Sequence, residues 1–118
     1  MSKTFYVTTT LPYVNSSPHI GFALEIVEAD VIARYHREIL NEQVIFNTGT
    51  DEHGQKIADQ AKAKGLDPQD YCDHFAQQFQ NLKNELNLSN THFIRTTNPK
   101  HSAAAQEFWR RCRANGDI

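Results

Sequence analysis

The feature that most constrains this chain is a strand-like segment that breaks off and is soon followed by a long helix. Residues 4–9 are rich in β-branched and aromatic side chains, which is typical of a buried strand. Ser17 is a suitable N-cap and Pro18 a suitable first helical residue, so a helix is predicted from Pro18 to about Asn41. The start of such a helix offers unpaired N–H groups and a partial positive charge, which suit it to hold phosphate.

Helix-like and strand-like segments alternate through the rest of the chain. The predicted first helix has apolar residues at helical spacing, at Ile20, Leu24, Val27, Val31, Tyr35 and Ile39. The segments that follow are a strand over 44–48, a helix over 55–64, a helix from 67, a strand over 91–95 and a helix from 98. The helix from 67 is predicted to bury a stripe made of Tyr71, Phe75, Phe79, Leu82 and Leu86.

This order predicts an α/β domain with a Rossmann-like parallel sheet and flanking helices. In such sheets ligands bind beyond the carboxyl ends of the strands, and two unusual loops, residues 11–19 and 49–54, fall there. The two loops together therefore predict one site. Neither a GxGxxG nor a GxxxxGK[ST] pattern occurs, which disfavours a dinucleotide dehydrogenase and a P-loop enzyme.

Composition limits the remaining classes. With 118 residues the chain is long enough for one domain but small for a complete enzyme that uses a nucleotide. Its net charge of −2 shows no global bias toward nucleic acid or a membrane, and neither a membrane span nor a signal peptide is predicted. Cys72 and Cys112 lack the spacing of a disulfide framework or a metal knuckle, which fits a reducing, cytoplasmic setting. No metal site is predicted, because the histidines outside the two loops share no ligand spacing: His36, His74, His92 and His101.

Several stretches resemble a known family. Residues 18–22 resemble the His-Ile-Gly-His signature of class I aminoacyl-tRNA synthetases, and residues 10–15 and 49–56 resemble methionyl-tRNA synthetases in particular. Residues 93–97 and 105–109 show the same similarity. The later Lys-Met-Ser-Lys-Ser-type loop, the zinc-binding cysteines and the anticodon-binding domain of that family have no counterpart. We therefore expect residues 1–118 to be the incomplete, N-terminal part of a nucleotide-binding catalytic domain.

The resemblance implies a methionine–tRNA ligase, which makes methionyl-adenylate from methionine and ATP, with Mg²⁺, and passes the methionyl group to tRNA. His19 matches the first histidine of the signature, which implies a catalytic role in binding the phosphates of ATP. Gly21 would let the adenine or ribose approach the helix. Phe22 stands in the ATP-binding signature where the family usually has a second histidine, and its ring cannot donate a hydrogen bond. We interpret Phe22 as natural to this branch of the family.

Three residues match the family's methionine site. Asp51 matches the aspartate that pairs with the α-ammonium group, and Leu11 and Tyr13 match residues that line the side-chain pocket. His53, in the same loop as Asp51, is a further candidate. A purely structural alternative stays open for each candidate: a helix cap for His19 and Asp51, and local packing for Leu11, Tyr13, Gly21 and His53.

Two other functions stay open. A small nucleotidyltransferase uses a similar helix start but lacks a clamp like Asp51, and the chain could also be a catalytically silent fragment. The isolated chain is expected to have very weak or no activity. Arg110, Arg111 and Arg113 are interpreted as a solvated helix end rather than a tRNA contact. Since half a sheet would expose an edge, the chain is also expected to be marginally stable or to self-associate.

Overall fold

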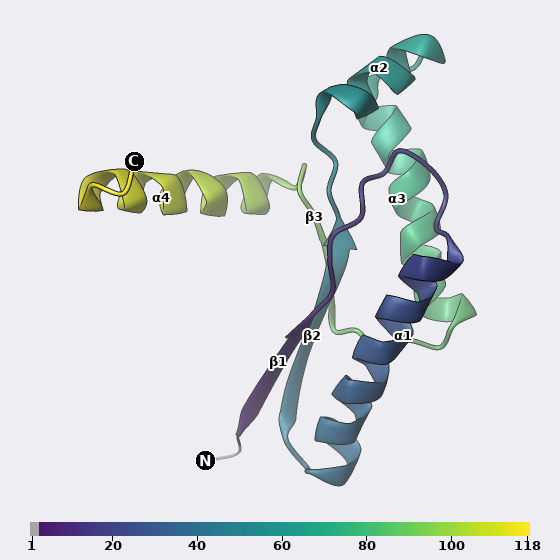
Figure 1. Ribbon diagram of the computed structural model, residues 1–118, viewed down its shortest axis with the longest axis vertical. Helices are drawn as coiled ribbons and strands as arrows, with labels where there is room; N and C mark the ends of the chain where they lie inside the picture. The colour runs from purple at the N-terminus through teal and green to yellow at the C-terminus, as the bar shows by residue number, and fades with distance from the viewer. Residues whose placement is uncertain (1–2) are drawn as a thin grey trace.

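A computed structural model describes residues 3–118 and is shown in Figure 1. Its elements are β1 (Thr4–Thr8), α1 (Ile20–Arg34) with a π-helical extension η1 (Tyr35–Ile39), β2 (Gln43–Thr50), α2 (Gln55–Ala63), α3 (Pro68–Glu85), β3 (His92–Arg95) and α4 (Pro99–Asn115). In this part of the chain, no helix combines the length and the apolar character that a bilayer crossing requires. The order of helices and strands is the one that the sequence predicts.

The three strands form one parallel sheet in the order β1-β2-β3. Tyr6 of β1 pairs with Ile45 of β2, and Gly49 of β2 pairs with Ile94 of β3. Helices α1 and α3 lie on the same side of this sheet (Figure 1). The predicted α/β class with a Rossmann-like parallel sheet is confirmed.

The core lies between the central strand and these two helices. Alternate side chains of β2 are buried on the face that the helices cover, with Phe46 fully inaccessible. From α3, the predicted stripe is buried through Tyr71, Phe75, Phe79 and Leu82, whereas Leu86, at the end of the helix, is 39% exposed. The periodic apolar pattern of α3 therefore predicted its inner face, except for the last residue.

The six apolar residues that recur along the predicted first helix, now in α1 and η1, do not pack on the sheet. All six are exposed, from 39% for Val27 to 87% for Ile20, and the residues of α1 that are buried are Phe22, Ile26, Ala29, Asp30 and Ala33. This helix is apolar on two faces, so periodicity alone does not tell which one meets the sheet. The outer face of α1 remains uncovered.

The predicted start of α1 is also corrected. The N-cap is His19 rather than Ser17, and the first helical residue is Ile20 rather than Pro18. His19 takes over the cap because its ring Nδ1 accepts a hydrogen bond from the backbone N–H of Gly21, at 3.1 Å. At the other end, α-helical geometry stops at Arg34 and one π-helical turn follows.

Helix α4 projects away from the sheet on the side opposite α1 and α3 (Figure 1). None of its residues is buried, and Phe108 and Trp109 are each more than half exposed. The radius of gyration is 16.7 Å, compared with about 13.5 Å for a compact domain of this length. The described chain is therefore more extended than a typical single domain.

At Gly49, strands β2 and β3 lie too close together to leave room for a side chain. A Cβ at this position would lie 2.0 Å from the carbonyl oxygen of Ile94, so only glycine allows this pairing. We expect Gly49→Ala to cost about 3 kcal/mol or more, at the upper end for an overpacked site. Gly65→Ala, in open space at a positive φ, should cost only about 1 kcal/mol. Equal losses in thermal unfolding followed by circular dichroism would contradict this reading.

The open edge of β1 and the outer face of α1 predict self-association of the isolated chain. Tyr6 on β1 and Val31 on α1 are each 60% exposed, and an unpaired edge strand is a template for further pairing. Light scattering after size exclusion should show species larger than a monomer, and Val31→Lys should reduce them more than Gln77→Lys on the exposed side of α3. A sharp monomeric peak with cooperative unfolding would refute the prediction.

Candidate functional site

The two loops that the sequence predicts to converge are joined by backbone hydrogen bonds. The N–H of Asp51 donates to the carbonyl of Pro12 at 2.9 Å, and the N–H of Val14 donates to the carbonyl of Asp51 at 3.3 Å. These bonds form a parallel bridge between Tyr13 and Asp51. The loop after β1 is therefore held beside the loop after β2, at the carboxyl ends of the strands.

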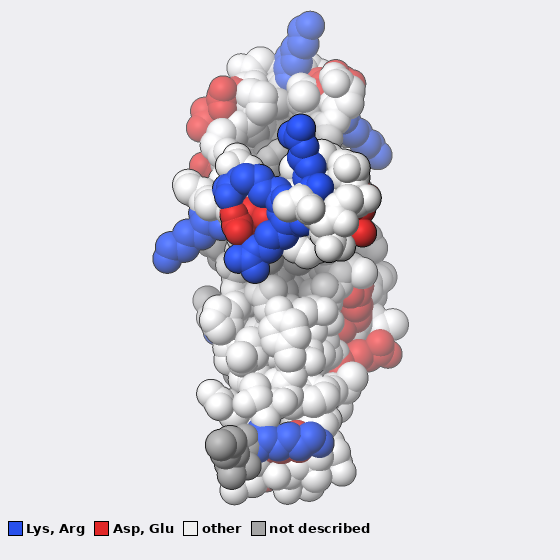
Figure 2. Space-filling view, turned by 90° about the vertical axis from the view of Figure 1, so that its left-hand side faces the viewer, with Lys and Arg blue, Asp and Glu red and all other residues white. Residues whose placement is uncertain are grey.

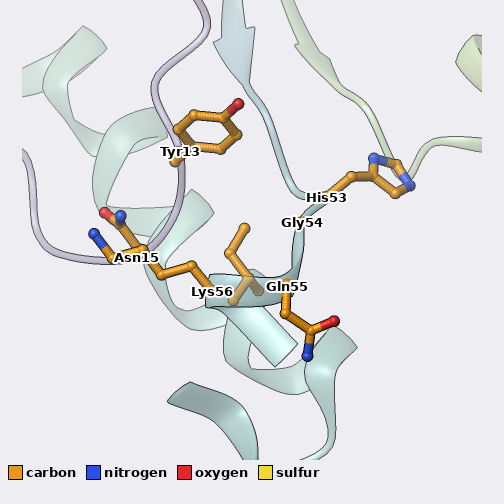
Figure 3. A pocket seen from close by; sticks show the side chains of 7 residues that line it. Tyr13, Asn15, His53, Gly54, Gln55 and Lys56 are labelled. Carbon is orange, nitrogen blue, oxygen red and sulfur yellow. The ribbon is translucent and has the colours of Figure 1, made fainter. Parts of the chain in front are cut away.

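A cavity of about 320 Å³ opens between these loops and the start of α2 (Figure 3). Tyr13 and Asn15 line it from the first loop, and residues 53–57 line it from the second loop and α2. Its size lies at the lower end of the range for small-molecule sites. A smaller cavity of about 160 Å³ adjoins His19 and also has Tyr13 and Asn15 in its wall. These two residues thus connect the surroundings of His53 and His19.

His19 lies exposed at the N-terminus of α1, where its ring caps the helix. Since Nδ1 accepts the hydrogen bond from Gly21, the neutral ring carries its proton on Nε2, which is then free to donate to a ligand. The capping alternative is thus what the structure adopts, and it leaves a donor beside the unpaired N–H groups of the helix. Gly21 leaves space for this ring, because a Cβ there would lie 3.0 Å from its Cε1.

Phe22 lies in the core. Its side chain is 6% exposed and meets the ring of Phe79 edge-on, with the ring centroids 5.3 Å apart. It also forms part of the wall of the cavity beside His19. A histidine at this position would bring a polar ring into an apolar contact. Leu11 is half-buried and lines neither of the two cavities.

The side chain of Asp51 is held within its own loop. Its Oδ1 accepts hydrogen bonds from the backbone N–H of His53 at 3.2 Å and from the hydroxyl of Thr96 at 3.3 Å. The N-cap of α2 is Gly54, which has no side-chain cap, so Asp51 does not cap that helix. About a third of the Asp51 side chain remains accessible, at 32%.

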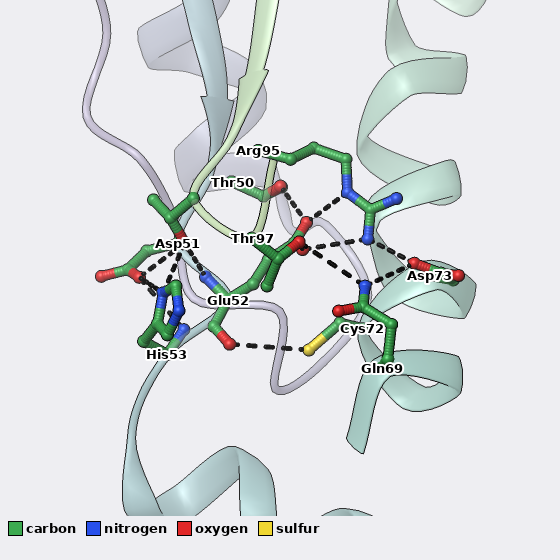
Figure 4. A network of polar contacts seen from close by, with 10 residues as sticks. Thr50, Asp51, Glu52, His53, Gln69, Cys72, Asp73, Arg95 and Thr97 are labelled. Carbon is green, nitrogen blue, oxygen red and sulfur yellow. Dashed lines mark hydrogen bonds and ion pairs between the residues drawn. The ribbon is translucent and has the colours of Figure 1, made fainter. Parts of the chain in front are cut away.

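Beneath this loop, Glu52 forms the centre of a buried polar network (Figure 4). Its side chain is fully buried and accepts two hydrogen bonds from Arg95, Nε at 2.6 Å and Nη2 at 2.9 Å, together with bonds from the hydroxyls of Thr50 and Thr97. Arg95 also pairs with Asp73 of α3. The network therefore ties the end of β2 to the end of β3 and to α3.

Burial would raise the pKa of Glu52, but the hydrogen bonds from Arg95, Thr97 and Thr50 outweigh it, so its pKa is lowered. The pKa of Asp73 is likewise lowered by its hydrogen bond with Arg95. Close by, burial raises the pKa of the Cys72 thiol to about 11. Glu52 is therefore ionised at neutral pH and Cys72 is not.

Sequence reasoning missed this network. The sequence patterns mark Glu52 only as part of the motif over 49–56, and Arg95, Thr96 and Thr97 only as part of the family-like stretch over 93–97. The rule that points to Asp51 also applies to Thr96 and Thr97, because they follow the neighbouring parallel strand β3 at its carboxyl end. Within residues 3–118, no three His, Cys, Asp or Glu side chains are grouped so that they could hold a metal ion.

Comparison with known proteins then decides the family. Residues 5–118 match the profile of the family described as "tRNA synthetases class I (M)". The chain belongs to this family of class I tRNA synthetases. It is 49% identical to the methionine–tRNA ligase of Thermotoga maritima over 97% of its own length, and 51% identical to that of Thermosynechococcus vestitus over its full length. It spans 18% and 22% of these two relatives.

Solved structures agree with this assignment. The Mycobacterium tuberculosis methionyl-tRNA synthetase in complex with methionyl-adenylate matches 97% of this class I synthetase chain with a TM-score of 0.93 and 43% identity. The chain covers 22% of that structure. A leucyl-type enzyme from Agrobacterium radiobacter, at 21% identity and a TM-score of 0.85, shares the fold. The family suggested by the sequence motifs is confirmed.

The arginines of α4 are partly neutralised by acidic neighbours. Arg110 and Arg111 both pair with Glu107 of the same helix, and Figure 2 shows basic side chains gathered around acidic ones on this side of the molecule. Pairs at this spacing are common on solvated helices. The helix end thus resembles an ordinary charged surface.

Acidification should test how much the Glu52 network contributes to stability. Because the folded-state pKa of Glu52 lies below its usual value of 4.5, its contribution to stability is complete above that pH and is lost as the pH falls through the lowered pKa. We expect the melting temperature to fall below about pH 4.5, and less steeply in Glu52→Gln than in the parent. Glu28→Gln, on the exposed side of α1, should keep the parent's slope. Identical slopes for both variants would contradict the prediction.

Proposed function

We propose that this chain supplies the methionine- and ATP-binding part of a methionine–tRNA ligase. The observation that carries the proposal is the backbone bridge between Tyr13 and Asp51, which joins the loop with the aromatic ring to the loop with the carboxylate at the edge of the sheet. The family match and the likeness to a synthetase in complex with methionyl-adenylate support the same reaction.

The two bridged loops bind methionine. The carboxylate of Asp51 pairs with the α-ammonium group, a charge-assisted contact that suits a partly buried carboxylate. The ring of Tyr13 lines the cavity and offers apolar surface to the thioether. Leu11 lies outside the cavity wall, and the family motif alone supports its part in the side-chain pocket. His53 lies in the wall of the same cavity.

The start of α1 binds ATP. The Nε2–H of His19 and the unpaired N–H groups of the first turn donate to phosphate oxygens, and the partial positive charge of the helix favours them. Gly21 lets the nucleotide approach the backbone. Magnesium would be bound mainly by the phosphates of ATP and by water, which is its common mode of binding at such sites.

In this reaction a carboxylate oxygen of methionine attacks the α-phosphorus of ATP, and the bond to pyrophosphate breaks. The chain contributes by aligning the two substrates and by stabilising the charge on the departing pyrophosphate, here through His19. A hydroxyl group of tRNA then attacks the carbonyl carbon of the adenylate, so the methionyl group passes to tRNA and AMP leaves. The two free thiols, Cys72 and Cys112, suit a reducing, cytoplasmic compartment.

Two alternative functions can be distinguished from the proposed one by experiment. A nucleotidyltransferase would transfer the adenylyl group to a substrate without an amino group, and the position of Asp51 beside Tyr13 favours an amino acid instead. A silent fragment would show no methionine-dependent exchange of pyrophosphate into ATP. That exchange assay, carried out with the whole natural polypeptide, separates the three.

Asp51→Asn tests the proposed role of the carboxylate. Loss of one partner of a charged pair costs about 2–5 kcal/mol, so we expect methionine to bind about 30-fold more weakly or worse, while ATP affinity stays within a few fold. Isothermal titration calorimetry with each substrate measures both. Asp59→Asn, an equivalent change on the exposed surface of α2, should alter neither. Equal weakening of methionine and ATP by Asp51→Asn would favour a structural role.

A further inference from the structure

Three groups of the loop after β2 converge on the hydroxyl of Thr96, which follows β3. Its Oγ1 accepts the backbone N–H of Glu52 at 2.8 Å and lies 3.3 Å from Oδ1 of Asp51 and 2.9 Å from Nδ1 of His53. Thr96 is 8% exposed, and its own N–H donates to the carbonyl of Thr50 at 3.2 Å. The position of this hydroxyl is therefore set by the sheet.

The number of available protons decides the direction of these bonds. A threonine hydroxyl has one proton, and an ionised carboxylate only accepts. All three contacts are satisfied when the hydroxyl donates to Asp51 and the ring of His53 donates from Nδ1. A neutral His53 then carries no proton on Nε2. Because the side chain is 66% exposed, this nitrogen is open to a ligand as an acceptor.

The same contacts orient the carboxylate of Asp51. Its Oδ1 is held twice, by the hydroxyl of Thr96 and by the N–H of His53. Among the residues that the structure describes, none donates a hydrogen bond to Oδ2. One carboxylate oxygen is thus anchored and the other is free to accept from an ammonium group.

We infer that Thr96 is a positioning residue, whose hydroxyl orients Asp51 and His53 at the edge of the methionine cavity. The inference rests on the proposed function for the identity of the ligand, an amino acid with a free ammonium group. Below Thr96, the Glu52–Arg95 network joins the ends of the same two strands and so keeps them together (Figure 4). Unlike that network, Thr96 contacts both the side chain of Asp51 and the side chain of His53.

Two neighbouring threonines provide a matched test. Thr96→Val keeps the shape of the side chain but removes the hydroxyl, and Thr96→Ser keeps the hydroxyl. Thr97→Val removes the adjacent hydroxyl, which bonds to Glu52 and to neither Asp51 nor His53. The variants are compared in the whole natural polypeptide by calorimetry with methionine and by ¹⁵N NMR of labelled histidine, with His53 assigned from a His53→Gln variant.

We expect Thr96→Val to weaken methionine binding about tenfold, the effect of losing one hydrogen bond to a charged group. The ¹⁵N shifts of His53 should change from the Nδ1–H form to the mixture of an unconstrained ring. Thr96→Ser should restore both, and Thr97→Val should leave methionine affinity within about twofold even if it lowers the melting temperature as much. Parent-like binding and shifts in Thr96→Val would overturn the inference, as would equal effects of both valine variants.

The two proposals fail separately in this experiment. If the parent protein binds no methionine, the proposed function is wrong, while the histidine shifts still report whether Thr96 holds His53. If the parent binds methionine and Thr96→Val binds it equally well, the proposed function stands and the positioning role of Thr96 is wrong.

Discussion

The buried pairing of Glu52 with Arg95 is the interaction on which the site depends. A fully buried carboxylate is tolerated only when hydrogen bonds compensate for its lost hydration, and here Arg95, Thr50 and Thr97 provide them. Removal of Arg95 would cost about 3–5 kcal/mol, because the charge of Glu52 would be left buried. The pair joins the carboxyl ends of β2 and β3, which are the two ends that carry Asp51 and Thr96.

The second organising feature is the apolar surface that residues 3–118 leave uncovered around the three-stranded sheet. The outer face of α1 is apolar and exposed, β1 has an unpaired edge, and α4 projects without burying any residue. The chain spans about a fifth of the relatives that it matches. The site itself is less affected, since its loops are fixed by the bridge between Tyr13 and Asp51 and by the network beneath it.

Much of the fold could be predicted because its signals are local. The apolar periodicity of α3 and the β-branched residues of the strands place these elements within a few residues. The sequence patterns failed where the structure depends on contacts between residues that are far apart in the chain. Two apolar faces compete on α1, and only packing on the sheet selects the one with Phe22 and Ile26. Similarly, Ser17 is a good cap on propensity, yet the ring of His19 reaches the N–H of Gly21 instead.

The sequence by itself determined the α/β class, the order of the elements, the two loops at the strand ends and the family, because each is written in local patterns and short motifs. Only the tertiary structure decided how the side chains of those loops are held. Asp51 and Thr96 are 45 residues apart in the chain and meet only because β2 and β3 pair in one register. A hydrogen bond between distant residues leaves no local pattern, so it is visible only once the strands are placed side by side.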